Sequence, residues 1–176
     1  MSTVTRIGLL VLSVLILGGS VGARERGETP APKAEGPQEV EVVGMAADPR
    51  TQQPFVLMQG RRDKRRFSMA IGFAEATSIA VALEGLTPPR PLTHDLFLTM
   101  FGRLNVALTR VVITDLRDDI YYAVVHLRHN GTEMILDSRP SDAIALAIRA
   151  KVPVFVEDRV FEKSTTPGAA APRERI

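Results

Sequence analysis

Two short segments carry the side chains best suited to chemistry. Residues 90–95 read Arg-Pro-Leu-Thr-His-Asp, and residues 139–142 read Arg-Pro-Ser-Asp. Each places an arginine before a proline and then a hydroxyl and an aspartate, at the predicted start of a helix. A helix start leaves backbone N–H groups free and carries the positive end of the helix dipole, so an arginine beside it favours phosphate binding. The two segments predict an anion site if the fold brings them together.

Candidate roles follow from side-chain chemistry. Imidazole exchanges protons near neutral pH, carboxylates accept protons, and guanidinium groups and hydroxyls bind phosphate oxygens. The candidate catalytic residues are His94, Asp95, Asp142 and Glu75. The candidate phosphate-binding residues are Arg90, Arg139, Thr93 and Ser141. A hard cation such as Mg²⁺ or Mn²⁺ needs converging carboxylates, for which the candidates are Asp95, Asp137 and Asp142.

The same residues also fit an ordinary structural interpretation. Thr93, Ser138 and Ser141 are typical helix N-caps. Asp95 and Asp142 are typical first-turn acids, each stabilising a helix by about 0.3–1 kcal/mol. Spacing alone favours capping over a metal or catalytic role.

Composition excludes several classes of protein. The 176 residues are 45% hydrophobic and 24% charged, which indicates a globular chain. The chain has no cysteine, so disulfides, thiolate zinc sites and cysteine nucleophiles are excluded. With 22 Lys and Arg against 20 Asp and Glu, and with no Trp, composition does not indicate a strongly basic nucleic-acid binder or an aromatic base-stacking platform.

One loop departs from this balance. Residues 61–66 contain five cations in six positions. The loop would contact a nucleic-acid backbone through non-specific phosphate contacts, or it is a solvated turn that keeps a sheet edge soluble. The sequence leaves both interpretations open.

The middle of the chain has the pattern of an α+β domain. Apolar residues at helical spacing predict helices over 76–83, from Thr93 onward, and over 141–150. The last of these is apolar on all sides, so we expect it at the centre of the domain. Residues rich in β-branched side chains predict strands over 39–46, 54–59, 66–71, 107–114, 120–127, 132–136 and 152–156. This order predicts a single compact α+β domain with about three helices.

The two ends have different compositions. Residues 1–23 have Arg6, an apolar run and a small-residue end, which is typical of a signal peptide. Because the run is short for a membrane span, we expect cleavage and export to the periplasm or the extracellular space, with no stable span afterwards; the alternative is an N-terminal membrane anchor. We expect a flexible linker over 24–37, the domain over 38–163 and a disordered tail over 164–176.

Four ordered segments resemble the bifunctional nuclease family. They are residues 71–76, 83–85, 90–96 and 137–149. The resemblance implies a mixed β-sheet, a homo-oligomer and hydrolysis of RNA and DNA. The positions it singles out are Glu75, Arg90, Thr93, His94, Asp95, Asp137, Arg139, Ser141 and Asp142.

Two functions are therefore carried forward. The first is an exported nuclease that hydrolyses phosphodiester bonds, with Mg²⁺ or Mn²⁺ assisting. The alternative is a non-catalytic exported module that binds an anion or a partner and forms oligomers. The first requires the two segments that begin at Arg90 and Arg139 to meet at one cavity.

Overall fold

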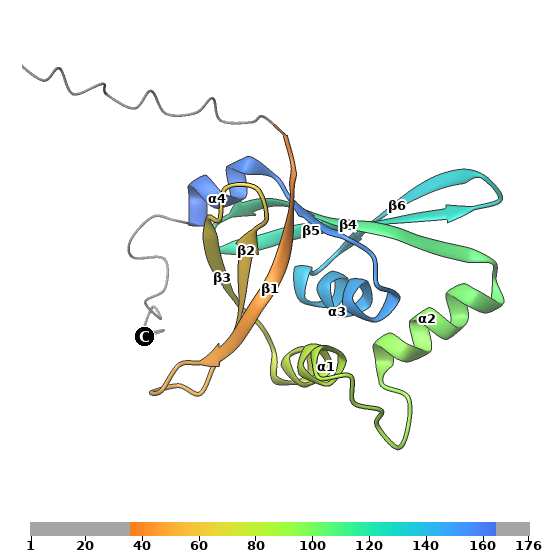
Figure 1. Cartoon of the computed structure of the whole chain (residues 1–176), viewed down its shortest axis with the longest axis horizontal. Helices are drawn as coiled ribbons and strands as arrows, with labels where there is room; N and C mark the ends of the chain where they lie inside the picture. Colours follow the sequence, from red (N-terminus) through yellow and green to blue (C-terminus); the bar gives the residue numbers. More distant parts are fainter. Residues whose placement is uncertain (1–35, 165–176) are drawn as a thin grey trace, which may run out of the picture. The chain divides into compact units, whose positions relative to one another are not determined.

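The computed structural model describes residues 36–164 (Figure 1). The predicted signal peptide, most of the predicted linker and nearly all of the predicted tail lie outside the described residues. Export therefore stays a prediction. Within residues 36–164, no helix is long and apolar enough to cross a membrane.

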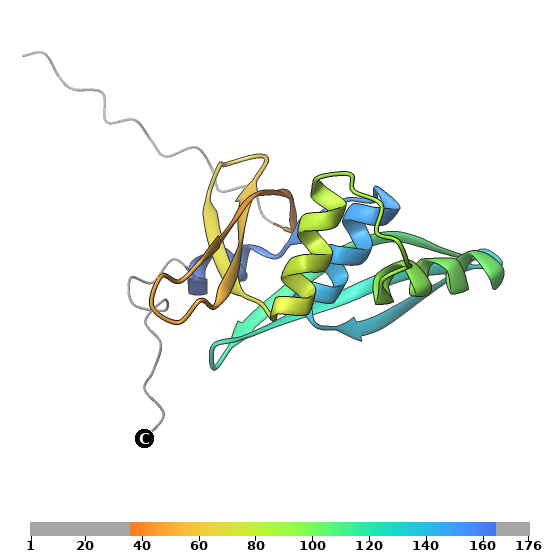
Figure 2. The ribbon, with the colours of Figure 1, turned by 90° about the horizontal axis from the view of Figure 1, so that it is seen from below.

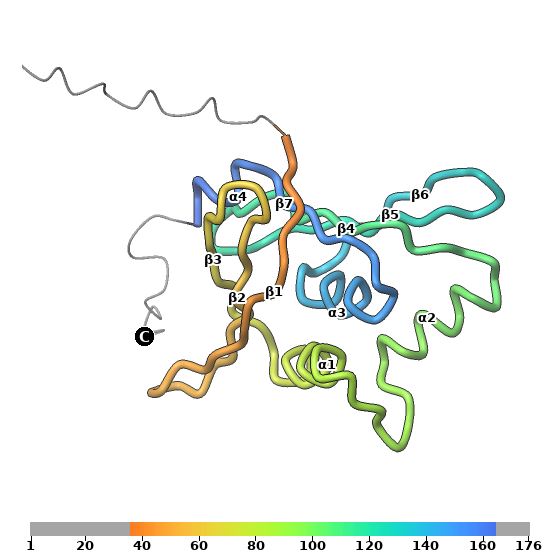
Figure 3. Tube along the Cα trace, viewed as in Figure 1, coloured from red at the N-terminus to blue at the C-terminus, as the bar shows by residue number. Residues whose placement is uncertain are grey.

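A seven-stranded mixed sheet forms the framework. Its spatial order is β3-β2-β1-β7-β4-β5-β6, and only β4 and β7 among neighbouring strands run parallel. Figure 3 shows β7 lying between β1 and β4. The strands are β1 (Gln38–Ala47), β2 (Pro54–Gly60), β3 (Arg66–Ala70), β4 (Val106–Arg117), β5 (Ile120–His129), β6 (Thr132–Ser138) and β7 (Val154–Val156).

Three helices gather on one side of this sheet, as Figure 2 shows. They are α1 (Phe73–Leu83), α2 (Thr93–Arg103) and α3 (Pro140–Ala150). The α+β class and the mixed sheet are thus confirmed. A fourth helix, α4 (Asp158–Ser164), was not predicted, because a seven-residue helix is too short to show a helical repeat.

Helix α3 forms the centre of the core, as its all-round apolar sequence predicts. Ala143, Ile144 and Ala147 are fully buried, and so are Val111 and Ile113 of β4 in the same hydrophobic cluster. Full burial of an Ile or Val side chain contributes about 1.5–3 kcal/mol. Packing of this helix therefore fixes the start of α3 relative to the sheet.

Two tight turns set the register of the strands beside α3. Asp118 and Asp119 join β4 to β5, and Asn130 and Gly131 join β5 to β6. All four have positive φ, between 49° and 80°, which is the conformation of a two-residue type I′ hairpin. These turns join the strands expected over 107–114, 120–127 and 132–136.

Strand β4 contains two irregularities. Its pairing with β5 shifts between Leu108 and Arg110 and again between Ile113 and Asp115. Thr109 and Thr114 are the extra residues at these β-bulges. Bulges re-aim the neighbouring side chains and occur often beside functional sites.

Candidate functional site

The starts of α1, α2 and α3 meet at one place. A cavity of about 460 Å³ is lined by the first turn of each helix, and a second cavity of about 400 Å³ adjoins it. Thr93, His94, Arg139 and Asp142 line both. The two segments singled out in the sequence are therefore in contact, through His94 and Asp142, which lie 48 residues apart along the chain.

His94 connects the three helices. It is buried, its Nδ1 lies 2.7 Å from Ser78 Oγ of α1, and its Nε2 lies 3.1 Å from Asp142 Oδ1 of α3. A carboxylate only accepts hydrogen bonds, so Nε2 carries a proton and donates to Asp142. In the neutral ring, Nδ1 then accepts from the Ser78 hydroxyl.

This arrangement allows His94 to change its charge without losing a partner. A serine hydroxyl either donates or accepts. When Nδ1 gains a proton, Ser78 accepts from it, and the contact with Asp142 becomes an ion pair. The sequence does not single out Ser78, because a serine in the second turn of a helix has no pattern that distinguishes it.

Arg139 joins the carboxylates at the same cavity. Its Nε donates to Asp142 Oδ2 at 2.7 Å, and its Nη2 donates to Glu75 Oε1 at 2.6 Å. The hydrogen bonds to Asp142 and then to Glu75 raise the pKa of the guanidinium. The Arg139 side chain is nevertheless 67% exposed, so a ligand entering from solvent reaches it.

Glu75 reaches Arg139 by folding back over Gly72. Gly72 is the N-cap of α1, with φ −70°. A Cβ at Gly72 would overlap a Glu75 carboxylate oxygen. The glycine thus makes room for a carboxylate that is only 14% exposed and paired with Arg139.

Asp95 lies apart from this network. Its Oδ2 accepts from the Leu92 backbone N–H at 2.8 Å, and its Oδ1 accepts from Arg149 Nε at 2.8 Å. Burial acts to raise the pKa of Asp95, but the bonds from Leu92 and Arg149 outweigh it and lower that pKa. Asp95 does not line either cavity, so its geometry is that of a capping residue rather than a catalytic one.

Three further candidates also lie away from the network. Arg90 is exposed in the α1–α2 loop, Ser141 is buried in α3, and neither lines the two cavities. Asp137 borders the second cavity, but it pairs with Val124, which faces the other side of the sheet. Because paired residues share a face, the Asp137 carboxylate points away from Asp142.

The expected caps are placed differently from the prediction. Helix α2 begins at Thr93 with Leu92 as its N-cap, and α3 begins at Pro140 with Arg139 as its N-cap. Neither N-cap side chain caps the free backbone N–H groups of its helix. Proline at the first helical position explains the early start of α3, since its missing N–H would have no partner there.

The carboxylates do not form the expected metal site. In residues 36–164, no group of three or more His, Asp or Glu residues is arranged to hold a metal ion. Asp95, Asp137 and Asp142 are separated as described above. Glu75 and Asp142 are the carboxylates that share the cavity, with Arg139 between them, so the cavity carries one net negative charge when His94 is neutral.

The basic loop is largely paired. Arg61 contacts Glu39 at 3.2 Å, and Arg65 pairs with Asp63 and Asp158 and stacks over Phe161. These contacts link the β2–β3 hairpin to β1 and α4. They favour the structural interpretation of the loop over a phosphate-binding one.

Comparison with known proteins gives consistent matches. Residues 56–168 match the family described as the bifunctional nuclease domain. Uncharacterized proteins of two Mycobacterium tuberculosis strains, CDC 1551 and H37Rv, are each 36% identical over 126 residues, covering 72% of this chain and 75% of theirs. Bifunctional nuclease 1 of Oryza sativa subsp. japonica is 36% identical over 85 residues, covering 47% of this chain and 26% of the rice protein.

Proposed function

The chain belongs to the bifunctional nuclease domain family, and on this premise we propose that it hydrolyses phosphodiester bonds of RNA or DNA at the cavity between α1, α2 and α3. The observation that carries the proposal is the hydrogen-bonded series Ser78–His94–Asp142–Arg139. It supports the proposal because an imidazole and an exposed guanidinium lie beside one solvent-accessible cavity.

Arg139 binds the scissile phosphate. Its guanidinium is the exposed member of the network. Arg139 is also the N-cap of α3, where backbone N–H groups lack helical partners. Two oxygens of a phosphate can accept two parallel hydrogen bonds from the N–H groups of one guanidinium. Turning toward the phosphate would release Asp142 and Glu75 from their bonds with Arg139.

His94 moves the proton. Asp142 holds Nε2, and Ser78 follows the protonation state of Nδ1 by reversing its hydroxyl. We assign His94 the transfer of a proton to the leaving oxygen or from the attacking water. Because both ring nitrogens are hydrogen-bonded, the Ser78 hydroxyl, which lines the cavity, relays this proton: it passes one proton on as it receives another.

The residues of this cavity that would hold a divalent cation are Glu75 and Asp142, rather than the three aspartates expected from the sequence. Both carboxylates supply hard oxygen atoms, and the cavity has an excess of negative charge once Arg139 has turned to the substrate. Mg²⁺ or Mn²⁺ held there would neutralise charge developing on the phosphate.

The test is cleavage of single-stranded RNA and DNA oligonucleotides by the purified chain, with EDTA and with added Mg²⁺ or Mn²⁺. We expect His94→Gln to lower kcat by about 10²–10⁴-fold, the usual contribution of proton transfer. Asp142→Asn should lower it by a similar factor. A loss of activity in EDTA that Mn²⁺ restores would support the metal.

The matched control is His129→Gln, at the end of β5 away from both cavities. It should cleave like the unaltered chain. Equal cleavage by the His94 and His129 variants would exclude the proposed role of His94. Activity that stays constant in EDTA would exclude the cation at Glu75 and Asp142.

A second candidate function is a non-catalytic module that uses the same cavity to bind an anion or a partner. It is favoured by the completeness of the network, since His94, Arg139, Asp142 and Glu75 all bond to one another or to Ser78. In that case, Asp142→Asn lowers the melting temperature, and no oligonucleotide is cleaved by any variant or by the unaltered chain.

We also propose that the chain forms homo-oligomers. Strand β6 is an open edge of the sheet, and it exposes Ile135 and Leu136. Helix α2 exposes Phe97 and Met100. Open strand edges and clustered apolar side chains are typical of association surfaces.

A further inference from the structure

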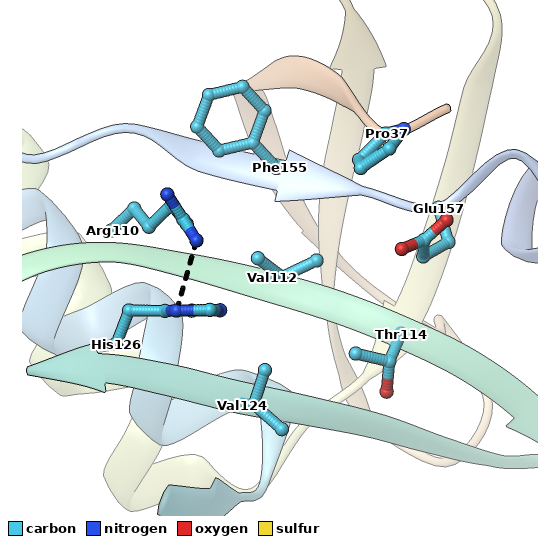
Figure 4. A pocket seen from close by; sticks show the side chains of 8 residues that line it. All are labelled: Pro37, Arg110, Val112, Thr114, Val124, His126, Phe155 and Glu157. Atoms are coloured by element: carbon cyan, nitrogen blue, oxygen red, sulfur yellow. Dashed lines mark hydrogen bonds between the residues drawn. The ribbon is translucent and has the colours of Figure 1, made fainter. Parts of the chain in front are cut away.

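A third cavity lies on the sheet face opposite the helices. It has a volume of about 360 Å³ and is formed by β4, β5 and β7 (Figure 4). Val111 and Ile113 of β4 point into the helical core. Side chains alternate along a strand, so Arg110 and Val112 point to the other face. We call this space the far-face cavity.

One end of the far-face cavity is formed by two basic side chains. Arg110 Nη2 lies 3.2 Å from His126 Nδ1, and the side chain of His126 is only 10% exposed. Figure 4 shows Arg110 and His126 side by side at this end. His126 lies in the strand expected over 120–127, and the structure places it within β5.

Glu133 fixes the orientation of this pair. Its Oε1 lies 2.8 Å from His126 Nδ1 and 3.3 Å from Arg110 Nη2. The hydrogen bond from His126, followed by the charge of Arg110, lowers the pKa of Glu133, so the carboxylate stays charged. Nδ1–H therefore donates to Glu133, and within residues 36–164 nothing bonds to Nε2. Nε2 and the remaining N–H groups of Arg110 are available to a ligand.

The other end of the cavity accepts hydrogen bonds. Thr114, at the second bulge of β4, and Glu157, just after β7, lie there in Figure 4. The Glu157 backbone N–H donates to Ile113 O at 3.0 Å, which holds the residue beside β4. Neither side chain makes a hydrogen bond to any part of the chain that the structure describes. The Glu157 carboxylate thus remains open to a donor from a ligand.

Apolar and aromatic groups connect the two ends. Val112 is buried and pairs with Phe155 of β7. The half-buried Phe155 ring stands beside the cavity, and an aromatic ring at such a position stacks on a flat ligand. Arg110 and Thr114 are four strand positions apart, about 13 Å at about 3.3 Å per residue. These side chains suit an elongated ligand with an anionic group, a flat ring and a hydrogen-bond donor.

We propose that the far-face cavity binds a 5′-mononucleotide. The phosphate accepts from Arg110, the base stacks on Phe155, and an exocyclic amino group donates to Glu157. A cavity of about 360 Å³ is within the range of small-molecule sites. The site is separate from the proposed hydrolytic cavity, because the sheet lies between them.

The experiment is calorimetric titration of the full chain with CMP, UMP and cytidine. We expect CMP to bind, and cytidine to bind at least about tenfold more weakly, because it lacks the charged group that Arg110 recognises. UMP should bind more weakly than CMP, because a carbonyl replaces the amino group facing Glu157. Glu157→Gln should remove the preference for CMP, and Arg110→Gln should weaken CMP binding by about tenfold.

Two variants serve as controls. Arg128→Gln removes an exposed arginine of the same strand pair that does not line the cavity. Asp142→Asn alters the hydrolytic cavity. Both should bind CMP like the unaltered chain, with melting temperatures confirming that every variant is folded.

Three results would overturn the proposal. They are no binding of CMP at millimolar concentration, equal weakening by Arg110→Gln and Arg128→Gln, and UMP binding as tightly as CMP. Loss of CMP binding in Asp142→Asn with retention in Arg110→Gln would assign the nucleotide to the hydrolytic cavity instead. Oligonucleotide cleavage is measured separately, so failure here leaves the proposed nuclease function standing.

Discussion

Asp95 and Asp142 are aspartates at the same position of two helices, but they make different contacts. Each is the third residue of its helix. Asp95 turns back to the Leu92 N–H and to Arg149, whereas Asp142 turns outward to His94 and Arg139. The difference arises from neighbours supplied by other helices. Residue type and helix position are therefore the same for both aspartates. Only the contacts with other helices distinguish Asp95, a helix cap, from Asp142, a candidate catalytic residue.

The capping role of Asp95 gives a prediction for stability. Asp95→Asn should lower the free energy of unfolding by about 1–3 kcal/mol at pH 7, because it weakens charge-assisted bonds to Leu92 and Arg149. The folded-state pKa of Asp95 is lowered, so its contribution is complete above the unfolded value of about 4 and is lost as pH falls through the lower folded value. Urea unfolding at several pH values measures this.

The control for that series is Asp118→Asn, in the β4–β5 turn, where asparagine also suits the positive φ of 49°. We expect little change in its stability at any pH. If the difference in the free energy of unfolding between the Asp95 variant and the unaltered chain stayed constant down to pH 3, Asp95 would not act as an ionised cap.

Among the elements, the start of α1 shows how a helix positions the site. Gly72→Ala should keep the fold, because φ −70° suits alanine. The added Cβ would displace the Glu75 carboxylate from Arg139. We therefore expect nuclease activity to fall by about tenfold or more, since a small displacement of a positioning group strongly affects rate, while circular dichroism stays native.

Gly102→Ala in α2 is the matched control. An added Cβ there meets no atom within 4 Å. It should raise stability by up to about 1 kcal/mol, from helix propensity alone, and leave cleavage unchanged. Equal activity in the two alanine variants would show that Glu75 does not contribute to the site.

Local sequence patterns predicted the helices and strands well, but they predicted poorly which side chains of different elements contact one another. The turns at Asp118–Asp119 and Asn130–Gly131 and the buried helix α3 follow from short-range chemistry, so they could be predicted. Ser78 and His126 could not be assigned, because their partners lie on other elements: His94 on α2, 16 residues from Ser78, and Glu133 on the neighbouring strand β6. The sequence predicts phosphate binding for both Arg90 and Arg139, because each precedes a proline near the start of a helix. Only Arg139 lines the cavity.

At the scale of the whole molecule, the open edge of the sheet bears on the proposed association. β6 has one strand partner, and Ile135 on it is 59% exposed. The strand contains no proline or lysine, which are residues that commonly protect an edge from pairing. A second copy of the chain that adds its own β6 would satisfy the open backbone groups and cover the apolar side chains.

Light scattering after size exclusion would test this association. The 19.2 kDa chain should elute with the mass of at least a dimer, and Ile135→Lys should shift it toward the monomer by placing a charge on the edge. Ile120→Lys is the control, because Ile120 is similarly exposed, at 58%, but lies at the β4–β5 turn. A monomeric unaltered chain, or equal behaviour of the two lysine variants, would mean that β6 stays an unpaired edge and that the cavities beside it are complete in one chain.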